Sequence, residues 1–567
     1  MKKILYSIVC LTSFMLHSVS TQEAYIQLAR ALRDEGNAQE ALIQYDIILQ
    51  KYPNSKEALF DLGALYYKQS NYSQSSLYLE KLLALEPSHF ETIYYLALDH
   101  THLGKHDKSI ELYKKATTLK PQDAKLHLNL AMAYKKCNKT QESIDAFLKA
   151  LSLQANLFDA QYNLACAYRD LKQYDLALEA YDKALGFNQN QFQILFEKAN
   201  VLTNKGTPED AIKIYSDLLV TAPANNTVLL NTAYAYKKIG QFDKACECYQ
   251  KVLAVQPNNN KALVGIAYAY LTMGDFKNGF STWMESNEKS SRLLKSKHEI
   301  KDKIIYIPLQ WCFEDLLQFS RYAKLLKEYG AKVYLQVNYS LVPLLKNCPY
   351  IDLIIEENGA IPPFDYYIPL LGLPLLFETE VSTVPHAPYL NAPQELVQFW
   401  KSKMHNDHNY RIGIYYKSEN PSPNLSENKN ISLKHFVPFC QLESVSVYSL
   451  QTLNSEEINQ LPSNIIINSF GSGFNAFYES LVNIAAVIEN LDLVITNDSL
   501  IAHVAGGLGK KVFVGLPYRA EWRWMEYRSD SPWYPTMTLF RQKESGNWQT
   551  VVQDMVNTFT LLKTIAA

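Results

Sequence analysis

Residues 491–542, LDLVITNDSLIAHVAGGLGKKVFVGLPYRAEWRWMEYRSDSPWYPTMTLFRQ, contain the pattern that decides the fold of the carboxyl-terminal half. An apolar run over residues 491–496 breaks around Asp498 into an expected helix that ends at Gly509, and a second apolar run follows at residues 511–516. Strand, turn, helix and strand in this order predict a βαβ unit. Open α/β sheets bind ligands at the carboxyl ends of such parallel strands, so we expect a functional site at this turn.

The start of the expected helix offers a place for a negatively charged group. With Asn497 or Asp498 as the N-cap, the backbone N–H groups of residues 499–501 point outward at the positive end of the helix dipole. Such an end binds a phosphate without the help of a metal ion. The alternative is that Asp498 and Ser499 only cap a structural helix.

The same stretch carries more specific motifs. His503 follows Asp498 and Ser499, and the runs WRW and SPWYPTM occupy residues 522–524 and 531–537. By these motifs the region from about residue 303 to residue 557 resembles the carboxyl-terminal domain of bacterial heptosyltransferase-like glycosyltransferases, which often follows tetratricopeptide repeats. The resemblance implies a GT-B-like region of two Rossmann-like domains, a nucleotide-sugar donor bound to the second domain as substrate, and no metal ion or other cofactor.

The resemblance also implies roles for individual side chains. Asp315 would act as the general base, because an acceptor hydroxyl is a poor nucleophile until a carboxylate takes its proton. Glu314 could substitute for it, and the alternative for Asp315 is that it caps the following helix. The other implied residues bind the nucleotide-sugar donor, and among them Arg523 would contact the leaving diphosphate. They are Asp498, Ser499, His503, Arg523, Lys417, Gln451 and Glu479.

Two departures from the family pattern favour a second hypothesis. Cys312 and Glu314 replace the glycines that surround the family's catalytic aspartate, and glycine permits a closer approach of the backbone to a substrate. Ile431 stands where the family has an arginine, which removes a bidentate phosphate contact. The second hypothesis is therefore a non-catalytic interaction scaffold with a degenerate transferase domain.

A period of 34 residues organises the chain before this region. Small residues recur at two positions of each period, and in seven of the eight periods an aromatic residue follows the second position, as in Ala131, Ser143 and Phe147. This period predicts eight tetratricopeptide repeats over residues 22–289, in which small residues let two helices approach closely. The fold class is therefore an all-α tetratricopeptide solenoid followed by an α/β region.

The concave face of such a solenoid usually holds an extended peptide. Asn129, Asn163 and Asn231 recur at one phase, and an amide that both donates and accepts can clamp a peptide backbone. The arrangement resembles the asparagine ladder of O-GlcNAc transferase and implies a polypeptide partner. Glu197 interrupts the row, and the alternative is a solvated polar face.

Composition and the first residues limit the function classes. A net charge of -2 from 55 basic and 57 acidic side chains argues against a nucleic-acid-binding surface, and the cysteines show no metal-ligand spacing. Residues 1–20 have the pattern of a signal peptide and are too short for a stable membrane span. The alternative is an additional amphipathic helix that caps the first repeat. Export to the periplasm would conflict with a cytoplasmic nucleotide-sugar, so both localisations stay open.

Alternating apolar runs predict the remaining domains. Residues 290–303 are rich in charged side chains, which is typical of a linker. Residues 304–405 are expected to form a first Rossmann-like domain, and residues 406–567 are expected to form the donor-binding Rossmann-like domain. The expected strands cover residues 304–309, 333–337, 351–355, 366–370, 411–416, 445–450, 465–467, 491–496 and 512–516. Together these features predict a metal-independent glycosyltransferase whose acceptor is recruited by the repeats.

Overall fold

The computed structural model describes residues 21–187, 190–287, 292–309, 312–386, 388–404, 408–417, 429–471, 474 and 480–566. The expected signal peptide over residues 1–20 and the expected donor contact Glu479 lie outside these residues. The chain divides into two compact units, Met1–Pro223 and Ala224–Ala567.

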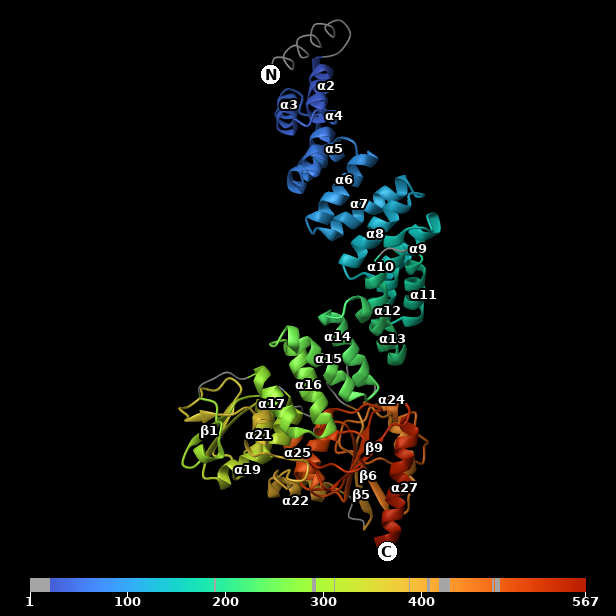
Figure 1. The fold of residues 1–567 in the computed structure, drawn as a ribbon. Coiled ribbons are helices and arrows are strands. Elements are labelled where there is room, and N and C mark those ends of the chain that lie inside the picture. Colours follow the sequence, from blue (N-terminus) through green and yellow to red (C-terminus); the bar gives the residue numbers. More distant parts are fainter. Residues whose placement is uncertain are drawn as a thin grey trace. The chain divides into compact units, whose positions relative to one another are not determined.

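The first unit is built from helical hairpins (Figure 1). Its helices are α2 (Thr21–Asp34), α3 (Ala38–Lys51), α4 (Lys56–Lys68), α5 (Tyr72–Leu85), α6 (Phe90–His102), α7 (His106–Leu119), α8 (Ala124–Lys136), α9 (Thr140–Leu153), α10 (Phe158–Asp170), α11 (Tyr174–Leu185), α12 (Gln191–Lys205) and α13 (Pro208–Thr221). The second unit begins with four more: α14 (Asn226–Lys238), α15 (Phe242–Val255), α16 (Asn260–Met273) and α17 (Phe276–Asn287). These sixteen helices of the described chain confirm the tetratricopeptide solenoid.

The two small positions of each repeat meet inside a hairpin, as the period predicts. The Ser143 hydroxyl donates to the Ala131 carbonyl at 2.9 Å, and the Ser109 hydroxyl donates to the Ala97 carbonyl at 3.0 Å. The aromatic Phe147 is fully buried beside them. Burial of such a side chain stabilises the fold by about 1.5–3 kcal/mol, so each hairpin depends on its neighbours for its core.

Two parallel sheets follow the repeats in the second unit. The first has the order β3-β2-β1-β4 and comprises β1 (Ile304–Ile307), β2 (Lys332–Val337), β3 (Leu353–Glu356) and β4 (Tyr366–Tyr367). The second has the order β6-β5-β7-β8-β9 and comprises β5 (Tyr410–Tyr415), β6 (Val445–Ser449), β7 (Leu493–Asn497), β8 (Val512–Leu516) and β9 (Met537–Arg541). Every pairing within them is parallel, which fits an α/β region.

The strand order of each sheet reverses beside its first strand. The reversal lies between β1 and β4 in one sheet and between β5 and β7 in the other. In doubly wound sheets, ligands bind in the crevice outside the carboxyl ends of the strands at this point. Strand β1 leads into α18 (Phe313–Phe319), and β7 leads into α26 (Leu500–Gly507).

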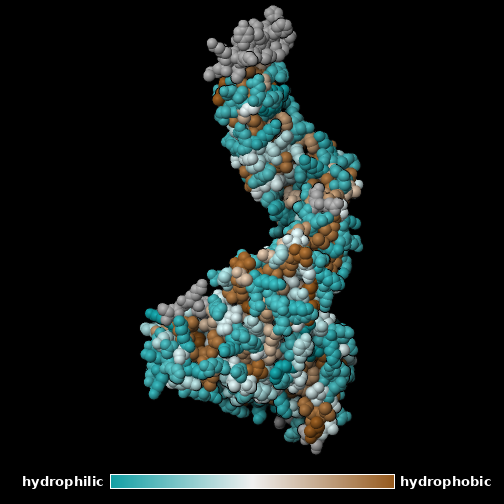
Figure 2. Space-filling model, in the orientation of Figure 1, coloured by the Kyte–Doolittle hydropathy of each residue, from teal (hydrophilic) through white to brown (hydrophobic). Residues whose placement is uncertain are grey.

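The remaining helices connect and cover the strands. They are α19 (Arg321–Glu328), α20 (Val342–Leu345), α21 (Leu373–Leu376), α22 (Gln394–Lys403), α23 (Val437–Cys440), α24 (Ser455–Ile458), α25 (Ser480–Ile488) and α27 (Trp548–Ala566). The first part of α27 is buried through Val551, Met555 and Phe559, whereas Leu561 and Ile565 near its end are exposed. Hydrophobic colour is visible at this end of the chain in Figure 2. Among the described residues, no helix has the length and apolar character needed to cross a membrane.

Two features of the sheets differ from the expectation. Residues 465–467 form no strand, because Ile466 is exposed and the segment touches the sheet only where Asn468 pairs with Tyr448. Strand β9 was not expected.

The linker is anchored to the first sheet. The Leu294 amide donates to the Tyr367 carbonyl at 2.9 Å, so the chain continues alongside β4 before β1 begins. Leu294 itself is buried in the core that the last repeat shares with the first sheet. The segment therefore connects the solenoid to the α/β region as a packed element.

A buried carboxylate in α6 makes the stability of the first unit depend on pH. Asp99 is fully buried, and burial raises its pKa to about 7. The pKa of an aspartate in an unfolded chain is about 3.9. Protonated Asp99 therefore contributes its full stabilisation of the fold below about pH 3.9, and this contribution is lost as the pH rises towards 7. We expect Asp99→Asn to raise the free energy of unfolding at pH 8 by about 3 kcal/mol, measured by urea denaturation.

The exposed Asp107 is the control, since Asp107→Asn should leave the difference in stability between pH 5 and pH 8 as it is in the wild type. An equal pH dependence in Asp99→Asn and the wild type would disprove the assignment.

Candidate functional site

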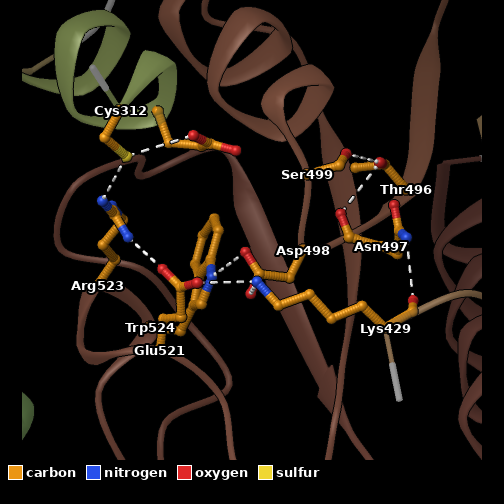
Figure 3. Close-up of polar contacts among 10 residues, drawn as sticks. Cys312, Lys429, Thr496, Asn497, Asp498, Ser499, Glu521, Arg523 and Trp524 are labelled. Carbon is orange, nitrogen blue, oxygen red and sulfur yellow. Dashed lines mark hydrogen bonds and ion pairs between the residues drawn. The ribbon is translucent and has the colours of Figure 1, made fainter. Parts of the chain in front are cut away.

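Charged side chains from both α/β domains meet beyond the ends of β1 and β7. Figure 3 shows Lys429, Asp498, Glu521 and Arg523 of this group. Asp315 lies in the first turn of α18, and Arg523 lies in the short 3-10 helix η6 (Trp522–Trp524). The Arg523 guanidinium forms one ion pair with Asp315 and another with Glu521. The Arg523 side chain is only 6% exposed, so this contact joins the two domains in a largely dry environment.

Lys429 extends the same network to the end of β7. Its Nζ lies 2.8 Å from Asp498 Oδ2 and 2.8 Å from Glu521 Oε1. The Trp524 Nε1 donates to the other carboxylate oxygen of Asp498 at 2.8 Å. We call Asp315, Lys429, Asp498, Glu521 and Arg523 the charged cluster.

The electrostatics keep both cations of the cluster charged. Burial by itself lowers the pKa of Lys429, but the carboxylates of Asp498 and Glu521 raise it above its ordinary value. Burial likewise lowers the pKa of Arg523, and the carboxylates of Asp315 and Glu521 outweigh it. The charged cluster thus contains two cations and three carboxylates. In the described part of the chain, no three His, Cys, Asp or Glu side chains are grouped to hold a metal ion.

The start of α26 differs from the expected one. Ser499, and neither Asn497 nor Asp498, is the N-cap, because Asn497 still belongs to β7 and the Asp498 carboxylate is bound by Lys429 and Trp524. The Ser499 hydroxyl shares a hydrogen bond of 2.8 Å with the Thr496 hydroxyl. The proposal that Asp498 only caps a helix is therefore wrong. So is the capping alternative for Asp315, since Cys312 is the N-cap of α18.

His503 lies on α26 and ends a chain of buried hydrogen bonds. Its Nδ1 is 2.8 Å from the Tyr534 hydroxyl, which is 3.2 Å from the Tyr389 hydroxyl. Arg321 Nη2 donates to the Tyr389 hydroxyl at 3.1 Å. Burial lowers the pKa of His503 well below its usual value, so its ring is neutral. Its Nε2 is buried without a hydrogen-bond partner in the described part of the chain.

The direction of this chain fixes the histidine tautomer. Arg321 can only donate, so Tyr389 accepts from it and is free to donate its own proton to Tyr534. Tyr534 then donates to His503 Nδ1, which places the histidine proton on Nε2. This order gives each hydroxyl proton an acceptor. It leaves Nε2–H as a donor beside the Trp524 ring, whose centroid is 5.5 Å from that of His503.

The tautomer can be measured directly. In ¹H–¹⁵N multiple-bond spectra, we expect His503 to carry its proton on Nε2, with its signal assigned through its loss in His503→Gln. Tyr534→Phe removes the donor to Nδ1 and should produce a mixture of tautomers. The exposed Tyr527→Phe is the control and should leave the signal unchanged. A wild-type proton on Nδ1 would contradict this direction.

The other expected donor residues lie near the end of β5. Gln451 Oε1 accepts from the backbone amides of Tyr416 and Lys417 at 2.9 and 3.1 Å. The Lys417 side chain is exposed and lies 3.8 Å from Glu457. Gln451 therefore shapes the backbone after β5, while Lys417 is not part of the charged cluster.

The three asparagines lie on the first helices of their repeats. In the first unit, Asn163 Oδ1 accepts from Lys135 Nζ at 2.9 Å, and Asn129 Nδ2 donates to the Tyr94 hydroxyl at 3.4 Å. In the second unit, Asn231 Nδ2 donates to the backbone carbonyl of Thr227 at 3.1 Å. Each amide thus has a local partner and retains part of its hydrogen-bonding capacity.

Several residues of the site were missed by sequence reasoning. Lys429 stands in a polar stretch with no local signal, while Glu521 has the weak signal of lying two residues before Arg523. Trp524 was not predicted as a site residue, yet its indole N–H donates to Asp498. Trp522 has a packing role, since its ring contacts Phe280, Phe319 and Trp533.

The last two repeats hold the loop that carries Glu521 and Arg523. Arg519 Nε donates to the Lys238 carbonyl at 3.0 Å. A Cβ atom at Gly240 would lie 2.9 Å from the Arg519 guanidinium, and one at Gly274 would lie 2.6 Å from the Met525 methyl group. Met525 has a φ of +52°, a strained value that this packing helps to maintain.

Comparisons with known proteins identify the helical part. Two family models match, described as "Tetratricopeptide repeat" over residues 32–224 and as "Psidin, N-terminal TPR repeats region" over residues 166–286. This part of the chain is a tetratricopeptide-repeat array, a class that functions in protein–protein interaction. The matching models end at residue 286, and no curated protein matches the chain.

Solved structures also show similarity to part of this chain. The carboxyl-terminal part of a TPR repeat-containing protein from Cytophaga hutchinsonii is 19% identical over 42% of this chain and 99% of its own, with a TM-score of 0.38. A MamA protein is 23% identical over 30% of this chain and 91% of its own, with a TM-score of 0.29. MamA from Desulfovibrio magneticus RS-1 is 19% identical over 30% and 98%, with a TM-score of 0.29.

Proposed function

We propose that the protein is a metal-independent glycosyltransferase that moves a sugar from a nucleotide-sugar to an acceptor recruited by its repeats. One observation carries this proposal: the charged cluster connects the carboxyl ends of two parallel sheets where the strand order of each reverses. Such an arrangement can hold a phosphorylated ligand on one sheet and a reacting group on the other. The motifs around His503 and Arg523 resemble those of transferases and support the same conclusion.

In this proposal Asp315 is the general base of the transfer. Its carboxylate is held by Arg523, so it must leave that ion pair before it accepts the proton of an acceptor hydroxyl. Arg523 and Lys429 stabilise the negative charge that develops on the departing diphosphate. The start of α26 at Ser499 offers further backbone N–H groups to the phosphates, while the fully buried His503 supports this helix through its hydrogen bond with Tyr534.

The acceptor is proposed to be a polypeptide that follows the concave face of the repeats. Helix α16 is the first helix of the last repeat, and it packs against η6, the element that carries Arg523. A peptide bound along this face would therefore have a route to Asp315.

A non-catalytic scaffold is the second candidate, and one observation favours it. Each cation of the cluster already has two carboxylate partners, so a diphosphate must displace one of them. Cys312 fills space where the family has glycine, since its sulfur lies 3.6 Å from Arg523 Nη2. In this case the repeats bind a partner, and the α/β region serves only as their support.

Calorimetry with the full chain distinguishes the two candidates. We expect saturable binding of at least one UDP-, GDP- or ADP-sugar in the presence of a chelator. Asp315→Asn should lower turnover about 100-fold or more, because it removes the base, while donor affinity changes by less than about tenfold. Asp530→Asn, an exposed change elsewhere, serves as the control. Absence of binding by the whole panel would favour the scaffold.

The asparagine ladder makes a separate prediction for the repeats. We expect Asn129→Ala, Asn163→Ala and Asn231→Ala together to weaken binding of extended 15-residue peptides from an immobilised library about tenfold or more. The reason is that each lost hydrogen bond costs about 0.5–1.5 kcal/mol. Gln141→Ala with Lys149→Ala, both exposed on the second helix α9, is the control. Equal peptide affinity in the triple variant and the control would rule out the ladder.

A further inference from the structure

Glu521 has a special position within the charged cluster. Its Oε1 binds Lys429 and its Oε2 binds Arg523, so one carboxylate connects both cations. Figure 3 shows Glu521 between the two cationic side chains. Asp498 binds only Lys429 and Asp315 binds only Arg523 among the ion pairs of the described residues.

The two cations form a geometry that suits a phosphoryl group. An ammonium and a guanidinium that converge on two oxygen atoms of one carboxylate can make the same contacts with two oxygen atoms of a phosphate. A phosphate carries more charge than a carboxylate and has more acceptor oxygens. The positive end of α26 begins next to Asp498, which Lys429 also contacts, and adds to the attraction.

We propose that Lys429 and Arg523 form an anion-binding site that Glu521 occupies, and that a phosphoryl group of a nucleoside diphosphate binds there by displacing the Glu521 carboxylate. The identity of the ligand rests on the proposed glycosyltransferase function. The site itself rests on the arrangement of the three side chains.

Glu521 is the carboxylate best able to leave. Its side chain is 30% exposed, compared with 14% for Asp315 and 4% for Asp498. Asp498 is also fixed by the indole N–H of Trp524, and a displaced Asp498 would leave that buried donor unpaired. Glu521 can turn to solvent at a smaller cost, because an exposed carboxylate recovers its hydration.

Calorimetric titration of the full chain with inorganic pyrophosphate, and separately with UDP, GDP and ADP, tests the proposal. Glu521→Gln keeps the size of the side chain but removes the competing charge, so we expect it to bind pyrophosphate at least tenfold more tightly than the wild type. Glu526→Gln is the matched control, since Glu526 lies in the same loop and pairs with Arg519. It should bind like the wild type.

Adding Lys429→Met to Glu521→Gln should remove the gain. If circular dichroism shows that Glu521→Gln does not fold, Glu521→Asp replaces it, because the shorter side chain cannot reach both cations and should also bind pyrophosphate more tightly. Equal pyrophosphate affinity in the folded variant and the wild type overturns the proposal. Tighter pyrophosphate binding by Glu521→Gln, with no binding of UDP, GDP or ADP, supports the anion site and contradicts a nucleoside diphosphate as its ligand.

Discussion

The ion pairs of Arg523 are the constraint on which the second unit depends. A buried guanidinium loses several kcal/mol of hydration, and only well-placed carboxylates compensate for that loss. Asp315 supplies one from the first α/β domain, and Glu521 supplies the other from the same loop as Arg523. The relative position of the two domains and the conformation of the loop are therefore specified by one buried cation.

A second buried arginine reinforces this junction. Arg321 donates to the carbonyl groups of Pro385 and Trp533 and lies against the rings of Tyr389 and Tyr534. The same tyrosines orient the ring of His503. The cluster's chemistry thus depends on contacts that also hold the domains together, and both candidate functions start from this common structure. They differ in whether an anion can replace Glu521.

The repeats contribute more than a platform for partners. The last two hairpins, from α14 onward, belong to the same compact unit as the sheets, and their turns at Gly240 and Gly274 pack against the loop of Arg523. The conformation of that loop therefore depends on the packing of the last two hairpins.

The sequence alone determined the repeats and the parallel sheets, because hydrophobic period and turn residues act over short distances along the chain. It also predicted Asp315, Asp498 and Arg523 as site residues, and these three side chains lie in one network of ion pairs. Only the tertiary structure decided the pairing of Lys429 with Glu521, 92 positions apart, the N-cap at Ser499, and the contact of Trp524 with Asp498. Partners of buried charges are chosen by packing between distant segments, which no local pattern encodes.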